Sequence, residues 1–158
     1  MRAVCIPKHG RPDVLEIRET VTPDPGPGEL RVAVRAAGLN FAEVLARQGL
    51  YPDAPQPPMV MGYEVAGVVD ALGPGVSSLR EGDRICALTR FGGHADTVIV
   101  GERQCFALPA RMSFAEAAAL PVNYLTAHHM LHRVFRVRAG DHVLVHQAAG
   151  GVGTAALQ

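Results

Sequence analysis

A short apolar run that leads into a cluster of glycines near the end of the chain constrains the fold most. Residues 142–153 read HVLVHQAAGGVG, and the apolar residues Ala155, Ala156 and Leu157 follow. Glycines let a backbone turn tightly and approach a pyrophosphate, and a following helix offers free N–H groups at its positive end. A strand, a glycine turn and a helix therefore predict the opening of a dinucleotide-binding domain. The residue that reads the ribose normally lies about 20 residues further on, so we expect no such position in these 158 residues.

The composition is that of a folded domain without a charge bias. Hydrophobic residues make up 48% of the chain, and fifteen basic residues balance fifteen acidic ones. The net charge therefore gives no support for a nucleic-acid or anionic-membrane partner. The chain has no apolar stretch of about 20 residues and its N-terminus lacks an apolar signal core, so we expect neither a membrane span nor a signal peptide.

Three cysteines, Cys5, Cys86 and Cys105, are far apart in the sequence and form no C-x-x-C pair. An odd number of widely spaced cysteines argues against a disulfide framework and against a zinc site built from cysteines. We therefore expect free thiols in a reducing, cytoplasmic environment.

The first 110 residues are rich in short segments with the alternation or apolar character of β-strands. The predicted strands lie within residues 2–6, 14–19, 30–38, 62–73, 79–89 and 92–102. Proline-rich loops are predicted at 22–29 and 51–59, because proline and glycine at this density exclude regular structure. Many short strands at close spacing indicate a partly closed β-barrel rather than alternating strands and helices.

Helical patterns interrupt and then follow this β-rich region. Residues 40–49 have apolar residues on one helical face, with Asn40 as the expected N-cap and Gly49 as the expected stop. Residues 113–120 begin with a capping-box pattern, Ser113 and Glu116. Residues 122–137 predict a long helix, and a strand is expected at 142–146.

Pro121 marks the predicted domain boundary, because the composition changes there. We expect a β-rich domain over residues 1–121 and the beginning of an α/β domain over residues 122–158.

Five segments carry a family resemblance, in the order GLNFAEVLARQGLYP, GYEVAGVV, GDRI, LPVNYLTAHHML and HQAAGGVG. Together they resemble the medium-chain dehydrogenase/reductase superfamily, in particular its zinc-independent quinone oxidoreductase branch and, within that, the synaptic-vesicle membrane protein subgroup. The resemblance covers essentially the whole chain. It implies a mixed α+β and α/β fold: a GroES-like β-barrel domain followed by the beginning of a Rossmann domain, truncated after the first glycine loop.

The resemblance also implies a reductase without zinc. Zinc enzymes of this superfamily have a cysteine where this chain has Asn40 and a histidine where it has Tyr63, and neither Asn nor neutral Tyr is a good zinc ligand. Asn40 and Tyr51 are then the candidate catalytic residues, since an amide N–H or a phenol O–H can stabilise charge on a carbonyl oxygen. The alternatives are an N-cap for Asn40 and a loop anchor for Tyr51.

The resemblance implies that NADPH is the cofactor. The candidate cofactor-binding residues are Asn123, Thr126, Gly150, Gly151, Val152 and Gly153. For Thr126 the alternative is a hydroxyl bonded to the carbonyl one turn back, and for the glycines it is an ordinary tight turn.

Other polar residues are assigned no site. His128 and His132 have the i, i+4 spacing of two metal ligands, but no third ligand is evident, so we interpret them as surface or interface histidines. Glu64 is assigned no catalytic role.

For the complete protein, the resemblance implies an NADPH-dependent oxidoreductase that transfers hydride to a quinone or an α,β-unsaturated carbonyl. Its expected partner is that small molecule, and a homodimer is allowed. One alternative is a non-enzymatic binding or trafficking protein of the same family. The other is an inactive fragment, in which a single Rossmann strand with unpaired edges cannot hold the cofactor.

Overall fold

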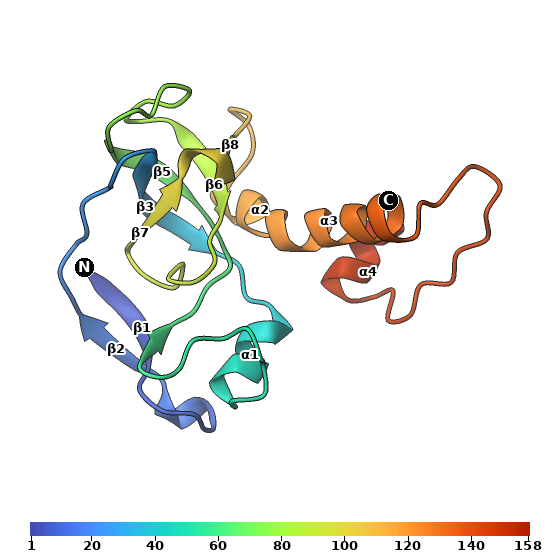
Figure 1. Ribbon diagram of the computed structural model, residues 1–158, viewed down its shortest axis with the longest axis horizontal. Helices are drawn as coiled ribbons and strands as arrows, with labels where there is room; N and C mark the ends of the chain where they lie inside the picture. The colour runs from blue at the N-terminus through green and yellow to red at the C-terminus, as the bar shows by residue number, and fades with distance from the viewer.

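The computed structural model describes residues 1–158. It has a β-rich body and a helical arm that projects from one side of the body (Figure 1). A three-stranded antiparallel sheet of order β2-β1-β4 consists of β1 (Arg2–Ile6), β2 (Glu16–Glu19) and β4 (Met59–Val60). A five-stranded antiparallel sheet of order β7-β3-β5-β6-β8 consists of β3 (Glu29–Ala37), β5 (Glu64–Leu72), β6 (Arg84–Leu88), β7 (Thr97–Gly101) and β8 (Cys105–Ala107). A bridge between Ala3 and Ala95 joins the two sheets, which gives the partly closed barrel that the strand spacing predicts.

The interior of the body is formed by alternate residues of the five-stranded sheet, because successive side chains of a strand point to opposite faces. On β3, Leu30 and Val32 are fully buried, and Val32 pairs with Val69 of β5. The main core cluster comprises Leu30, Val32, Val65, Val69, Leu79, Ile85, Ala87, Val98 and Val100. This apolar packing fixes the ends of β3 and β5, and with them the positions of Asn40, which follows β3, and Glu64, which starts β5.

The shortest strands were not predicted from the sequence. With two residues in β4 and three in β8, neither is long enough to show an alternating pattern. The predicted strand 14–19 begins only at Glu16, because residues Pro12–Val14 form a short 3₁₀ turn, η1. A second 3₁₀ turn, η2 (Glu102–Gln104), separates β7 from β8.

Helix α1 (Phe41–Arg47) forms where the sequence predicts it. Asn40 occupies the N-cap position in an extended conformation, and the chain leaves the helix through Gly49 at φ +77°. A positive φ is readily adopted only by glycine, which explains the stop.

The arm begins with the predicted capping box. In α2 (Phe114–Ala118), the Glu116 backbone N–H donates to Ser113 Oγ at 3.2 Å, and the Ser113 backbone N–H donates to the Glu116 carboxylate at 2.8 Å. Helix α3 (Pro121–His128) starts at Pro121 and continues as a π-helical segment, η3 (His129–Val134). The predicted helix 122–137 therefore begins one residue earlier and ends three residues earlier. No helix is long and apolar enough to cross a membrane.

The strand predicted at 142–146 does not form, and this prediction is wrong. The segment runs as an irregular loop at the far end of the arm before α4 (Gly151–Ala156), which packs on α3 (Figure 1). A strand needs a hydrogen-bonded neighbour, and the segment has none, so Val143 and Leu144 are 48% and 80% exposed.

Candidate functional site

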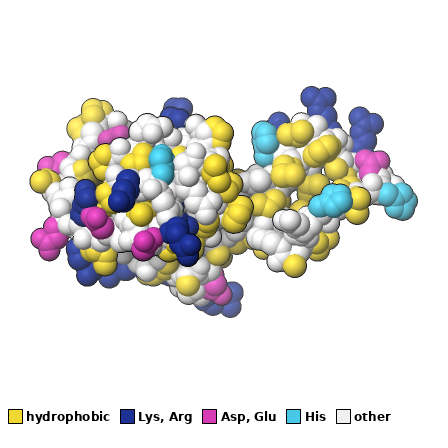
Figure 2. Space-filling model, turned by 90° about the horizontal axis from the view of Figure 1, so that it is seen from below, with side chains coloured by type: hydrophobic (Ala, Val, Ile, Leu, Met, Phe, Trp, Pro, Cys, Tyr) yellow, Lys and Arg dark blue, Asp and Glu magenta, His cyan; other side chains and the backbone are white.

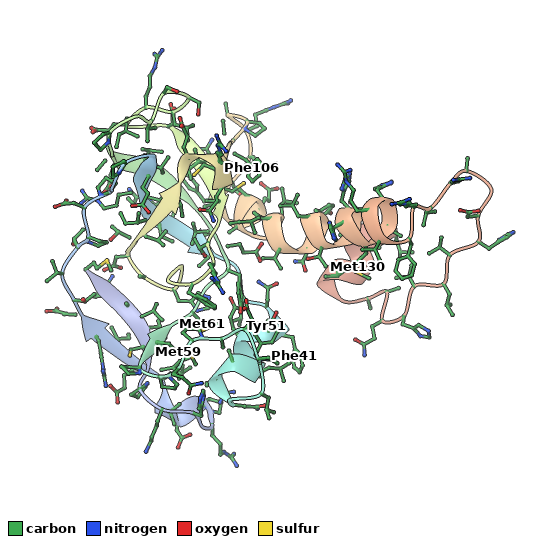
Figure 3. All side chains as sticks on the ribbon, viewed as in Figure 1. Phe41, Tyr51, Met59, Met61, Phe106 and Met130 are labelled. Carbon is green, nitrogen blue, oxygen red and sulfur yellow. The ribbon has the colours of Figure 1, made fainter.

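A cavity of about 1040 Å³ lies between the start of α1, helix α3 and the C-terminal segment. Fourteen of its 23 lining residues are hydrophobic, as is usual for a ligand site with a few polar groups. Figure 3 shows Phe41 on α1 and Met130 on the helical arm, two of the apolar residues that border it. The cavity therefore lies where the body meets the arm.

The cavity brings together most of the site residues predicted from the sequence. Asn40 lines it from the body, Asn123 lines it from α3, and the stretch 150–153 lines it from the glycine turn. Tyr51 and Thr126 do not line it. These groups are separated by about a hundred residues in the chain, so only the fold places them on one cavity.

The Asn40 side chain does not act as the helix cap. The backbone N–H of Asn40 donates to the Glu43 carboxylate, which supplies half of a capping box. The Asn40 amide instead donates from Nδ2 to Glu64 Oε1 at 2.9 Å. The residue therefore has the N-cap position, while its side chain is turned toward a buried carboxylate.

Glu64, to which the sequence analysis assigned no role, contacts the cavity-lining residue Asn40. It is 1% exposed at the start of β5, and its second oxygen, Oε2, accepts from the backbone N–H of Val122 at 2.8 Å. The available signal was a single acidic residue in the otherwise apolar stretch GYEVAGVV, because a buried carboxylate requires dedicated partners.

A second buried carboxylate, Glu43, lies beside this one and is 4% exposed. Burial raises the pKa of Glu43, an effect opposed by the N–H groups of Asn40 and Tyr63 and by nearby His94, while the charge of Glu64 adds to the rise. His94 Nε2 lies 3.7 Å from Glu43 Oε1 and 3.0 Å from the Gly38 carbonyl oxygen. These groups form a compact polar network inside the body, and Asn40 connects this network to the cavity.

The glycine turn is shaped by close contacts within the arm. The Gly150 backbone N–H donates to the Gln147 carbonyl at 2.9 Å. A Cβ at Gly151 would lie 2.5 Å from the Asn123 Oδ1 atom, and one at Gly153 would lie 2.6 Å from the Cα of Ala148. Local packing alone therefore demands small residues at positions 151 and 153, and both of these glycines line the cavity.

Tyr51 packs away from the cavity, against the aromatic side chains of the body. Its ring meets Tyr63 edge-on with centroids 6.2 Å apart, and Tyr63 meets Phe91 at 5.7 Å. Figure 3 shows Tyr51 near Met61, close to α1. The Tyr63 hydroxyl is buried without a partner, and burial raises its pKa to about 12.

Thr126, the other predicted site residue that does not line the cavity, is exposed on α3.

No group of three or more His, Cys, Asp or Glu side chains is arranged to hold a metal ion. His128 and His132 share one face of the arm with ring centroids 4.7 Å apart, and Figure 2 shows histidines on the arm among exposed apolar side chains. The three cysteines are free thiols, and burial raises the pKa of Cys105 to about 12.

Residues 26–130 match the alcohol dehydrogenase GroES-like domain family. The chain belongs to this family. With its ordered motifs it is a member of the medium-chain dehydrogenase/reductase superfamily, as the sequence predicts. A GroES-like β-barrel domain followed by the beginning of a Rossmann domain is confirmed as the fold class.

Among relatives of this GroES-like family, the rat synaptic vesicle membrane protein VAT-1 homolog is 51% identical over 144 residues, which are 91% of this chain and 36% of the relative. The human VAT-1 homolog-like protein superposes with a TM-score of 0.95 at 41% identity, covering 99% of this chain and 50% of that one. The quinone oxidoreductase of Escherichia coli, solved with NADPH, gives 0.91 at 34% identity, covering 99% and 48%. The chain spans half or less of the length of each.

Proposed function

We propose that the complete protein transfers hydride from NADPH to a quinone or an α,β-unsaturated carbonyl without zinc. The observation that carries this proposal is the single cavity that joins the Asn40 amide of the body to the glycine turn of the arm. The similarity to a quinone oxidoreductase solved with NADPH supports it. Three free thiols suit a cytoplasmic protein.

The residues on the arm fit a dinucleotide. Three of the four residues at 150–153 are glycines that line the cavity and have no side chain to block a pyrophosphate, and the Asn123 side chain lies beside Gly151. Thr126 is proposed as a further contact from α3. NADPH, when bound, supplies the hydride; its choice over NADH rests on the family.

Asn40 would steady the substrate oxygen. One amide N–H is held by Glu64, which leaves the second N–H for an oxygen that gains negative charge. Tyr51 would be the second group, and because its ring packs on Tyr63, a substrate contact requires the 51–59 loop to move.

Substitution of Asn40 tests this proposal in the complete protein. Asn40→Ala should lower kcat for NADPH-dependent reduction of a quinone or an enone by about 10²–10³-fold, the usual cost of losing one oxyanion donor. Tyr51→Phe should lower kcat less, and Ser77→Ala, far from the cavity, should leave it unchanged. A zinc chelator should leave the wild-type rate unchanged. Absence of NADPH-dependent turnover with every quinone and enone tried would overturn the proposal.

The binding alternative has one observation in its favour. The arm exposes Val134, Phe135 and Leu144, an apolar surface of the kind that contacts other macromolecules. Tight NADPH binding without turnover on any quinone or enone would favour this alternative.

A further inference from the structure

Glu64 connects three parts of the molecule that are far apart in sequence. It starts strand β5, its Oε1 accepts the Asn40 amide at 2.9 Å, and its Oε2 accepts the Val122 backbone N–H at 2.8 Å. No Lys, Arg or His forms an ion pair with it. A buried carboxylate without a cationic partner is costly, so its two hydrogen bonds must account for its presence.

The chain makes room for this carboxylate. A Cβ at position 38 would overlap the Glu64 side chain, and the Gly38 backbone N–H donates to the Glu64 carbonyl at 3.0 Å. Gly38 lies two residues before Asn40, at the end of β3. The approach of β3 to β5 therefore delivers the Asn40 amide to Glu64.

The carboxylate decides which way the Asn40 amide faces. Both Glu64 oxygens accept hydrogen bonds, Oε2 from the Val122 backbone N–H and Oε1 from the Asn40 amide, so the Asn40 amide turns its NH₂ group, and not its oxygen, toward Glu64. The second amide hydrogen is then held in a fixed direction beside the cavity. An amide free to rotate would present oxygen and nitrogen alternately to a substrate oxygen.

The other oxygen of the same carboxylate reaches the arm. Val122 supplies one of the first N–H groups of α3, which has no partner within the helix. A negative charge at this end of a helix is also favourable. Val122 and Asn123 both line the cavity, so Glu64 ties the orientation of the Asn40 amide to the helix that carries the proposed cofactor contacts.

We propose that Glu64 is a positioning residue that fixes the Asn40 amide as a donor toward the substrate oxygen. Through its hydrogen bond to Val122, Glu64 also fixes the position of this amide relative to α3. The kinetic part of this inference rests on the proposed function. The structural part does not, because the Asn40–Glu64 bond can be observed without cofactor or substrate.

Nuclear magnetic resonance tests the structural part in this chain, whose only asparagines are Asn40 and Asn123. With ¹⁵N-asparagine, Glu64→Gln should shift the Asn40 side-chain amide signals and speed their hydrogen exchange by about tenfold. The Asn123 signals, from an amide that donates to the Ala119 carbonyl, should not move. Glu102→Gln, which alters a carboxylate on the far side of the body, should leave both unchanged. Unchanged Asn40 signals in Glu64→Gln would overturn the proposal.

A second variant covers the case in which Glu64→Gln does not fold. In Asn40→Asp, the introduced carboxyl would face Glu64, and two carboxylates so close cannot both stay charged. Titration should show that one of the two facing carboxyls has a strongly raised pKa. Ordinary pKa values for both carboxyls would show that position 40 does not face Glu64, and would overturn the proposal.

The kinetic experiment uses the complete protein. Glu64→Gln should lower kcat by about tenfold or more in the wild type, but by less than about twofold when Asn40→Ala is already present, because coupled residues are not additive. Independent, multiplying effects would overturn the positioning role. If the wild type itself shows no turnover, the proposed function fails and the resonance experiment still decides the role of Glu64.

Discussion

At the scale of single residues, the site depends on polar groups buried inside an apolar body. Glu43 and Glu64 are each less than 5% exposed, and the oxygens of both accept hydrogen bonds from N–H groups. For Glu64 both donors belong to distant segments, whereas Glu43 binds the N-cap of its own helix and Tyr63. Residue type alone does not reveal this, because most glutamates in a chain are on the surface.

The raised pKa of Glu43 predicts a pH dependence of stability. A carboxyl whose pKa is higher in the folded than in the unfolded state binds protons more tightly when folded. Its contribution to stability is complete below the ordinary value of 4.5 and is lost as the pH rises through the folded pKa. The free energy of unfolding, measured by urea titration at a series of pH values, should therefore decrease as the pH rises above 4.5.

Glu43→Gln should reduce that slope, because the titrating group is gone. Glu116→Gln is the matched control: hydrogen bonds from Ser113 lower the pKa of Glu116, so its titration lies below 4.5. An equal slope in the wild type and in Glu43→Gln would show that Glu43 does not titrate in this range.

At the scale of elements, local sequence signals determine where helices start, whereas a strand forms only where another strand is available to pair with it. Ser113 and Glu116 form their capping box without help from the rest of the fold. Residues 142–146 have the composition of a strand but no neighbour to pair with, and so they stay irregular.

The capping box of α2 predicts a measurable stability loss. Ser113→Ala removes the acceptor of the Glu116 N–H and should lower the free energy of unfolding by about 1 kcal/mol. Ser77→Ala is a suitable comparison, since the backbone N–H of Ser77, rather than its hydroxyl, binds Glu102. Equal stability of the two variants would contradict the role of the cap.

The contact between α3 and α4 depends on Gly151. Gly151→Ala would bring a Cβ against the Asn123 side chain and should destabilise the docking of α4 by about 1–3 kcal/mol. Gly150→Ala has more room, with its nearest contact at 3.3 Å, and should cost less. Hydrogen exchange of the α3 and α4 amides would measure both effects, and equal exchange rates would refute the contact.

At the scale of the whole molecule, a well-packed body carries a thinly packed arm, and Figure 2 shows a narrow waist between them. Most residues after Ala127 are exposed, so few packing contacts hold the segment before the glycine turn in the position that a dinucleotide would need. Neither the predicted domain boundary at Pro121 nor a homodimer is tested by the structure, and both stay predictions.

The 158-residue chain by itself should therefore bind NADPH more weakly than low micromolar and should self-associate through its arm. Leu144→Ser should reduce self-association in sedimentation experiments. Ile17→Ser, at a residue 75% exposed on β2, should not. An NADPH dissociation constant in the low micromolar range or below, or equal effects of the two substitutions, would contradict this prediction.

The sequence by itself determined the family, the β-rich body, the position of α1 and the glycine turn, because these depend on local patterns and on the order of motifs. Only the tertiary structure decided where the polar groups meet. Asn40 could be read as a helix cap or as a site residue, and its side chain turned to Glu64 only because β3 and β5 pair and Gly38 leaves room. These hydrogen bonds join residues that are separated by 24 positions (Asn40 and Glu64) and by 58 positions (Glu64 and Val122) in the sequence. No local pattern encodes contacts over such separations.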